Sequence, residues 1–168
     1  MNKREARMSQ IEKKELILET SLQSFFFDEL QKVNHKSQHP LRNELIFYSS
    51  NVMDCLSESD KYFQIIDGKI QEKLLGPKLL QAENLSKAKK KKELKDVGDT
   101  ALLLCGLFPE SLEGKIVDAR YYQDLGKMAY SQLDGLVPSF LDMESFYRFL
   151  ARSFEMMTNL MSIVATKF

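Results

Sequence analysis

Apolar residues recur along most of this chain at steps of three and four positions, the spacing that places side chains on one face of a helix. Residues 9–33 and 41–56 each carry one such apolar stripe, so the sequence predicts a helix over each of them. Alternation with a period of two, which marks a half-buried strand, is weak. Further helices are predicted over residues 77–97, 100–108, 118–133 and 143–166. The pattern therefore predicts an all-α fold, a single-domain bundle of six or seven helices over residues 1–168, with residues 1–8 as a flexible N-terminus.

Prolines and glycines predict where these helices begin and end. Pro40 cannot lie inside a helix, which indicates a loop between the first two helices. Residues 61–75 fit either one helix or two short pieces, because a glycine interrupts them. Pro77 suits a helix start, where its missing amide proton would be unpaired anyway. Gly98 is expected to end that helix in a left-handed conformation, and Asp99 to cap the next one.

The last predicted helix, residues 143–166, carries two apolar stripes. The first contains Met143, Tyr147, Leu150, Phe154, Met157, Met161 and Val164. The second contains Phe146, Phe149, Met156, Leu160 and Ile163. A helix with one face in water needs only one stripe, so this helix is either central to the bundle or covered by a second subunit. The second stripe is a candidate interface, and a two-fold homodimer is one interpretation of it.

Composition and charge exclude several classes of function. Apolar residues at 43% and charged residues at 29% are ordinary values for a globular protein. The 24 basic residues equal the 24 acidic ones, which argues against nucleic acid as the main partner. No apolar run approaches the ~20 residues of a membrane span, so we expect no membrane insertion. Cys55 and Cys105 stand far apart without a CxxC motif, as in a reducing compartment, and we expect a cytoplasmic protein.

Catalytic and ligand-binding motifs are not recognised in the chain. His35 and His39 have the spacing of a helical metal pair, but Pro40 argues against a helix there, and no third ligand is near in sequence. Residues 87–95 contain six lysines among nine positions, which favours a solvent-exposed helix face over a DNA- or lipid-binding patch because arginine and aromatic residues are missing. Glycine-rich phosphate loops are missing too. We therefore expect no catalytic residue, no metal and no cofactor.

Tyrosines and small residues share one face of the predicted helix at residues 118–133. Tyr122, Gly126 and Tyr130 follow one another at steps of four, and Gly126 allows another helix to approach closely. Buried tyrosines need hydrogen-bond partners, and Asp99 is the natural acceptor. The candidate network contains Asp99, Tyr121, Tyr122, Gly126 and Tyr130. It either fixes the register between helices or lines a small-molecule pocket, and we expect this helix and the C-terminal one at the centre of the bundle.

Several of these residues form an ordered series of motifs. The series runs Gly98-Asp99, Phe108-Pro109, Tyr121-Tyr122 and Gly126-x-x-Ala129-Tyr130. It resembles that of a family of uncharacterised helical proteins of proteobacteria, whose N-terminal helix also contains a Phe-Phe pair like Phe25-Phe26. The resemblance implies a helical fold and a bacterial cytoplasmic location. The family has no assigned activity, cofactor or catalytic residues, and the lysine-rich stretch before Gly98 departs from its pattern.

Two classes of function follow from this pattern. The first is a non-enzymatic protein-interaction or regulatory module with an unidentified protein partner, because catalytic motifs are missing while a doubly apolar helix is present. The alternative is a small-ligand-binding sensor with a pocket beside Asp99, Tyr122 and Tyr130. An enzyme that uses tyrosine and aspartate for acid–base chemistry comes third. A cavity of ~300 Å³ or more at those tyrosines would favour the sensor, and a filled core there would favour the interaction module.

Overall fold

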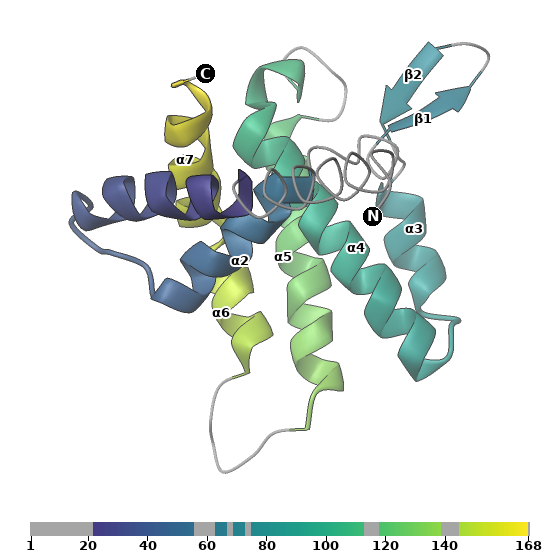
Figure 1. Cartoon of the computed structure of the whole chain (residues 1–168). Coiled ribbons are helices and arrows are strands. Elements are labelled where there is room, and N and C mark those ends of the chain that lie inside the picture. Colours follow the sequence, from purple (N-terminus) through teal and green to yellow (C-terminus); the bar gives the residue numbers. More distant parts are fainter. Residues whose placement is uncertain are drawn as a thin grey trace, which may run out of the picture.

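A computed structural model of the chain describes residues 22–55, 63–66, 69–72, 75–112, 118–138 and 145–167. Helices dominate this part (Figure 1). They are a first helix at residues 22–35, α2 (Asn43–Asp54), α3 (Leu75–Ala82), α4 (Lys87–Leu107), α5 (Ala119–Leu136), α6 (Phe146–Arg152) and α7 (Phe154–Ala165). A 3₁₀ helix, η3 (Pro109–Leu112), follows α4. The predicted all-α class and the single helical domain are confirmed, whereas the expectation for residues 1–8 lies outside the described residues.

Helix α4 is the organising element of the bundle. It packs most extensively on α5 and also contacts α7 and α3, and Figure 1 shows α5 beside it. All six residues from Ala101 to Gly106 are buried, so this half of α4 has no face in water. The sequence predicts that residues 118–133 and the C-terminal helix form the centre of the bundle. This prediction is correct for α5 but omits α4. The separate short helix predicted at residues 100–108 is the second half of α4.

The predicted break at Gly98 and Asp99 is wrong, because α4 runs through both residues. Gly98 is needed for close packing: a Cβ atom there would lie 2.5 Å from Cε1 of Tyr130. The chain breaks earlier instead, after α3 ends at Ala82, and α4 begins after Ser86, whose extended backbone (φ −59°, ψ 154°) opens the new helix. The predicted helix at residues 77–97 is thus the end of α3 and the start of α4.

In the predicted segment 61–75, residues 63–66 and 69–72 are strands, and Leu75 is the first residue of α3. Strands β1 (Phe63–Ile66) and β2 (Lys69–Glu72) pair antiparallel, with Ile65 opposite Ile70. The sequence contains the signal for this hairpin, because Asp67-Gly68 separates two short runs rich in β-branched residues. The helical interpretation gives the glycine too little weight as a turn residue.

The C-terminal apolar segment is two helices instead of the single one predicted. Ser153 separates α6 from α7 (φ −96°, ψ 6°), and its backbone N–H donates to the carbonyl of Phe149 at 2.9 Å. The start of α5 is as predicted, since the side chain of Asp118 accepts a hydrogen bond from the backbone N–H of Tyr121 at 3.1 Å. Residues 9–21 of the first predicted helix, and Met143, lie outside the described residues.

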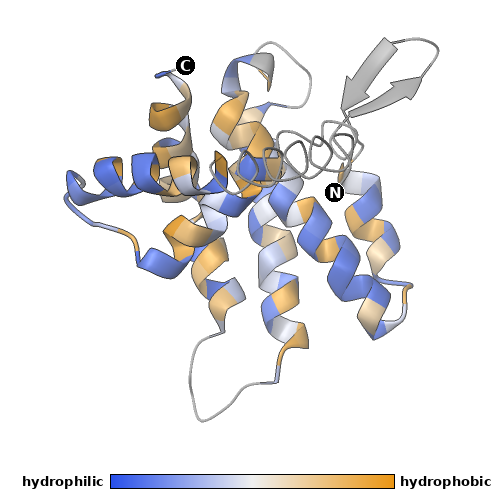
Figure 2. Cartoon of the chain, in the orientation of Figure 1, coloured by the Kyte–Doolittle hydropathy of each residue, from blue (hydrophilic) through white to orange (hydrophobic). Residues whose placement is uncertain are grey.

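Polar and apolar side chains separate clearly over α4 and α7. Figure 2 shows the hydrophilic first half of α4 and the hydrophobic turns of α7. Within the lysine-rich run, Lys87, Lys89, Lys92 and Lys95 are exposed, which confirms the expected solvent-facing helix surface. Cys105 is buried, and burial raises the pKa of its thiol to about 12. Across the described helices, none combines the length and the apolar character needed to cross a membrane.

Candidate functional site

A hydrogen-bonded cluster joins three helices at Asp99. The Tyr130 hydroxyl on α5 donates to Oδ1 of Asp99 on α4 at 2.8 Å, and the Tyr48 hydroxyl on α2 donates to the same oxygen. Oδ2 pairs with Nζ of Lys95, one turn earlier on α4, at 2.6 Å. Both carboxylate oxygens are therefore engaged, and the cluster holds α2, α4 and α5 together.

Burial and charge keep both tyrosines of this cluster protonated. Burial is the largest cause that raises the pKa of Tyr130, and the negative charge of Asp99 adds to it. The same two causes, in the same order, raise the pKa of Tyr48 far above its ordinary value. A hydroxyl that keeps its proton through the physiological range donates a stable hydrogen bond and is a poor general base. Both hydroxyls therefore remain hydrogen-bond donors to Asp99.

Close packing fills the space around Tyr130. Its side chain is fully buried, and its ring lies against Gly98. One turn away on α5, a Cβ atom on Gly126 would lie 2.4 Å from Cε2 of Phe154 and 3.0 Å from Cβ of Ala101. The two glycines thus allow α4, α5 and α7 to approach more closely than any larger residue permits.

The structure brings together only part of the predicted tyrosine network. The predicted Tyr130–Asp99 hydrogen bond is present, and Gly126 lies at a close helix contact. Tyr122 is buried as well. It lies eight residues before Tyr130, which is ~12 Å along the axis of α5, and this distance separates it from Asp99. Tyr121 is 42% exposed, and its hydroxyl lies beside Gly76 of α3.

The sequence-based network omits Tyr48, which contributes the second hydroxyl. A signal for Tyr48 exists, because it falls on the apolar stripe of residues 41–56 as the only member with a polar group at its tip. An apolar stripe predicts only that the residue is buried. It says nothing about the partner of its hydroxyl, which lies 51 positions away.

A second region of interest is a groove along α7, with a volume of about 340 Å³. It is lined by Val33, Lys36, Ser37, His39, Leu41, Met156, Asn159, Leu160 and Ile163. We call it the α7 groove. Met156 is 37% and Ile163 48% exposed, while Leu160 is buried at its base. Asn34 stabilises the opposite wall through two hydrogen bonds to the backbone of Leu41. Its side-chain amide donates to the Leu41 carbonyl at 2.9 Å, and its side-chain oxygen accepts from the Leu41 N–H at 2.8 Å.

An aromatic hollow of about 450 Å³ lies between the first helix, α2 and α6. It is lined by Phe27, Asn43, Glu44, Phe47, Tyr48, Asn51 and Phe146. Phe47 is 54% exposed and meets the ring of Phe27 edge to face, with centroids 6.2 Å apart. Between this aromatic hollow and the α7 groove, the guanidinium of Arg42 lies 4.3 Å from the ring centroid of Phe149.

The predicted interface stripe is therefore divided between two surfaces. Phe146 faces the aromatic hollow, whereas Met156 and Ile163 face the α7 groove. Phe149 is half-buried beneath Arg42, and Leu160 is 8% exposed. Ser153 lies between the residues that face the two surfaces.

The wall of the α7 groove formed by residues 33–41 carries a lysine and no carboxylate. Lys36 and His39 line the groove, and Arg42 follows on the same segment. Residues 30–43 contain no aspartate or glutamate. The nearest carboxylate before them in sequence, Glu29, is paired with Lys32 at 2.6 Å and Lys167 at 3.0 Å. The groove thus combines an apolar base with a cationic edge.

Neither histidine belongs to a metal cluster in the portion of the chain that the structure describes, where no group of three or more potential ligands forms. His35 ends the first helix and His39 lies in the following loop, so the two do not share a helix face. Comparison with family models, curated proteins and solved structures finds no match to this chain. The resemblance carried by residues 98–130 stays a prediction.

Proposed function

We propose that this protein is a non-enzymatic interaction module that binds a protein partner in the α7 groove. The observation that carries the proposal is the exposure of Met156 and Ile163 in a groove with an ordered, apolar base. Contiguous exposed apolar surface on a globular protein commonly marks an interface. The proposal includes the bacterial cytoplasmic location that the sequence resemblance implies.

Charge complementarity favours an acidic amphipathic helix as the partner segment. Such a helix places apolar residues at i, i+3, i+4 and i+7 into a groove and leaves its acidic face beside the rim. Lys36 and Arg42 would attract that acidic face. A second copy of this chain, joined through the same groove about a two-fold axis, would bring these cations toward their symmetry mates. Self-association through the groove is therefore the less favoured form of the proposal.

The alternative proposal of a ligand sensor beside Tyr130 has less support. Three cavities of the described part have volumes of about 400, 340 and 450 Å³, and none of these three is lined by Asp99, Tyr122 or Tyr130. The ring of Tyr130 fills the space beside Gly98. A filled core at this position favours a network that fixes helix register.

Site-specific photocrosslinking in the native cell tests the interaction. A benzophenone amino acid replaces Met156 in one variant and Met128 in a control. Met128 is 49% exposed on α5 and does not line the groove, so the two positions are matched in residue type and exposure. We expect a discrete adduct with one other protein from position 156 and none from position 128.

The purified partner then gives the quantitative test. Ile163→Glu should weaken its binding at least ~10-fold, whereas Met128→Glu should leave the affinity within ~2-fold. An adduct that contains only this chain would replace the heterologous partner with a homodimer. Equal adducts from both positions, or none from position 156, would overturn the proposal.

A further inference from the structure

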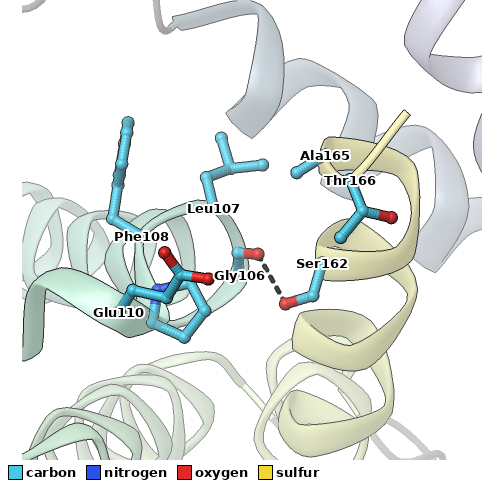
Figure 3. A pocket seen from close by; sticks show the side chains of 8 residues that line it. Gly106, Leu107, Phe108, Glu110, Ser162, Ala165 and Thr166 are labelled. Carbon is cyan, nitrogen blue, oxygen red and sulfur yellow. Dashed lines mark hydrogen bonds between the residues drawn. The ribbon is translucent and has the colours of Figure 1, made fainter. Parts of the chain in front are cut away.

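A third cavity lies where α4 and α7 end, away from both surfaces described above, and has a volume of about 400 Å³. It is lined by Gly106, Leu107, Phe108, Pro109, Glu110, Ser162, Ala165 and Thr166. Figure 3 shows the residues from α4 and η3 on one side and those from α7 on the other. A cavity of this size is large enough for a small organic group.

The two helices are held together just beneath this cavity. The Ser162 hydroxyl donates to the carbonyl oxygen of Gly106 at 2.7 Å, which is the dashed line in Figure 3. A Cβ atom on Gly106 would lie 2.9 Å from Cε of Met161, so the helix backbones approach closely at this level. Beyond the contact α4 and α7 diverge, and their last turns form the walls of the cavity. The site is therefore built on two fixed helix ends.

Both helix ends place negative potential at the cavity. The C-terminus of a helix carries about half an elementary negative charge, which a basic residue in the last turn commonly offsets. Neither α4 nor α7 has a basic residue in its last turn. Lys167 follows α7, but its Nζ lies 3.0 Å from Oε2 of Glu29, so that charge is already paired.

Glu110 adds a full negative charge to the same place. It lies on η3, is exposed, and lines the cavity. Among the described residues it forms no hydrogen bond or ion pair. Two helix C-termini and one carboxylate thus converge without a cation from the described part of the chain, while Leu107, Phe108 and Pro109 provide an apolar wall.

We infer that this cavity, which we call the α4/α7 end site, binds a primary ammonium carried on an aliphatic stem. The ammonium group donates to the carboxylate of Glu110 within the negative potential of the two helix ends, and the stem packs on Leu107 and Phe108. A free aliphatic amine and a lysine side chain share this chemistry. The site is independent of the α7 groove, so either can fail without the other.

Titration of the full-length protein with n-butylammonium chloride tests the inference. Amide chemical shifts in a ¹⁵N-labelled sample should change saturably at Glu110, Ser162 and Thr166, and isothermal calorimetry should give the affinity. Butan-1-ol has the same stem without charge, and potassium chloride at equal ionic strength has the charge without the stem. We expect neither of these to produce the same localised, saturable shifts.

A pair of matched variants decides whether the carboxylate matters. Glu110→Gln should weaken n-butylammonium binding ~10-fold, because a hydrogen bond to a charged group is replaced by a neutral one. Glu83→Gln is the control, since Glu83 is also exposed and also follows a helix end, that of α3, but does not line the cavity. It should leave the affinity unchanged.

A capped tripeptide with a central lysine distinguishes the two sources of the ammonium group. Tighter binding of the peptide than of n-butylammonium assigns the site to a protein segment, and the reverse assigns it to a free amine. Equal affinity for butan-1-ol, saturable localised shifts with potassium alone, or an unchanged affinity of Glu110→Gln would overturn the inference. Shifts spread over the whole molecule, or no shifts at all, would overturn it as well.

Discussion

The contact of α5 with α4 and α7 differs from the surface formed by α2, α6 and α7, although apolar stripes contribute to both. At the first, Gly98 and Gly126 remove two side chains, and the rings of Tyr130 and Phe154 occupy the space. At the second, Phe47, Met156 and Ile163 line open hollows and remain 37–54% exposed. The comparison teaches that apolar character alone does not decide burial. A helix stripe is buried when its neighbour offers a surface into which it fits.

The polar groups of the two regions differ in the same way. Asp99 has its two oxygens occupied by Tyr48, Tyr130 and Lys95, which fixes one arrangement of three helices. Lys36 and His39 line the edge of the α7 groove, where the proposed partner would bind. One region therefore specifies the fold, and the other is available for recognition.

The largest expected effect is at the close contact of α5. Gly126→Leu should lower the free energy of unfolding by at least about 3 kcal/mol, because even a Cβ atom would overlap the ring of Phe154. Urea denaturation followed by circular dichroism measures it. Gly135 lies on the same helix with nothing within 4 Å of a Cβ atom, so Gly135→Leu should raise stability by about 0.5–1 kcal/mol. Equal effects of the two substitutions would contradict the close contact.

Loss of the shared acceptor should have the next largest effect. Asp99→Ala leaves the hydroxyls of Tyr48 and Tyr130 without their carboxylate, and we expect a loss of about 2 kcal/mol in the same urea assay. Asp99→Asn keeps one acceptor oxygen and should lose about half as much. If both variants unfold at the same urea concentration as the parent protein, the cluster does not stabilise the contact of α2, α4 and α5.

Alkaline pH should weaken the buried cluster through its tyrosines. In the folded state the pKa of Tyr130 is raised by burial and then by Asp99, whereas an unfolded tyrosine ionises near pH 10. The stabilising effect of the raised pKa is therefore fully present below pH 10 and is lost as the pH rises toward the folded value. Each buried tyrosine should cost about 1 kcal/mol of stability by pH 10.5.

Urea midpoints at pH 8, 9.5 and 10.5 measure this loss. Tyr130→Phe should reduce the slope of stability against pH above 9.5, whereas Tyr121→Phe should not, because Tyr121 is 42% exposed. A parent protein whose stability stays constant up to pH 10.5 would show that these hydroxyls ionise freely in the folded state.

The smallest effect on stability is expected at the α7 groove. Met156→Glu with Ile163→Glu should change the free energy of unfolding by no more than about 0.5 kcal/mol per site, because both side chains are substantially exposed. Phe149→Glu and Leu160→Glu are expected to destabilise the monomer itself, since these residues are half-buried and buried. Sedimentation velocity at micromolar concentration supplies the second readout. A dimer of the 19.5 kDa chain that the first pair dissociates without unfolding would establish self-association through the groove.

Local patterns were sufficient for much of the fold. Periodicity in three and four identified the helices, and Asp118 was recognised as the cap of α5 because a cap depends on residues within one turn. The close contact at Gly126 was also predictable, since tyrosines and small residues repeat at steps of four along one helix face. The hairpin at β1 and β2 had a local signal in Asp67-Gly68, and the prediction missed it because this dipeptide was overlooked.

The sequence by itself determined the helical class, the buried tyrosine on α5 and its acceptor on α4, because these follow from periodicity and from the need of a buried hydroxyl for a partner. Only the tertiary structure decided that α4 continues through Gly98, that α6 and α7 separate at Ser153, and that Tyr48 completes the cluster. Each of these depends on what a distant helix places opposite the residue. Gly98, for example, could end a helix or give room to the ring of a neighbouring helix. Which of the two occurs depends on the position of Tyr130 in the fold, and the local sequence around Gly98 does not contain this information.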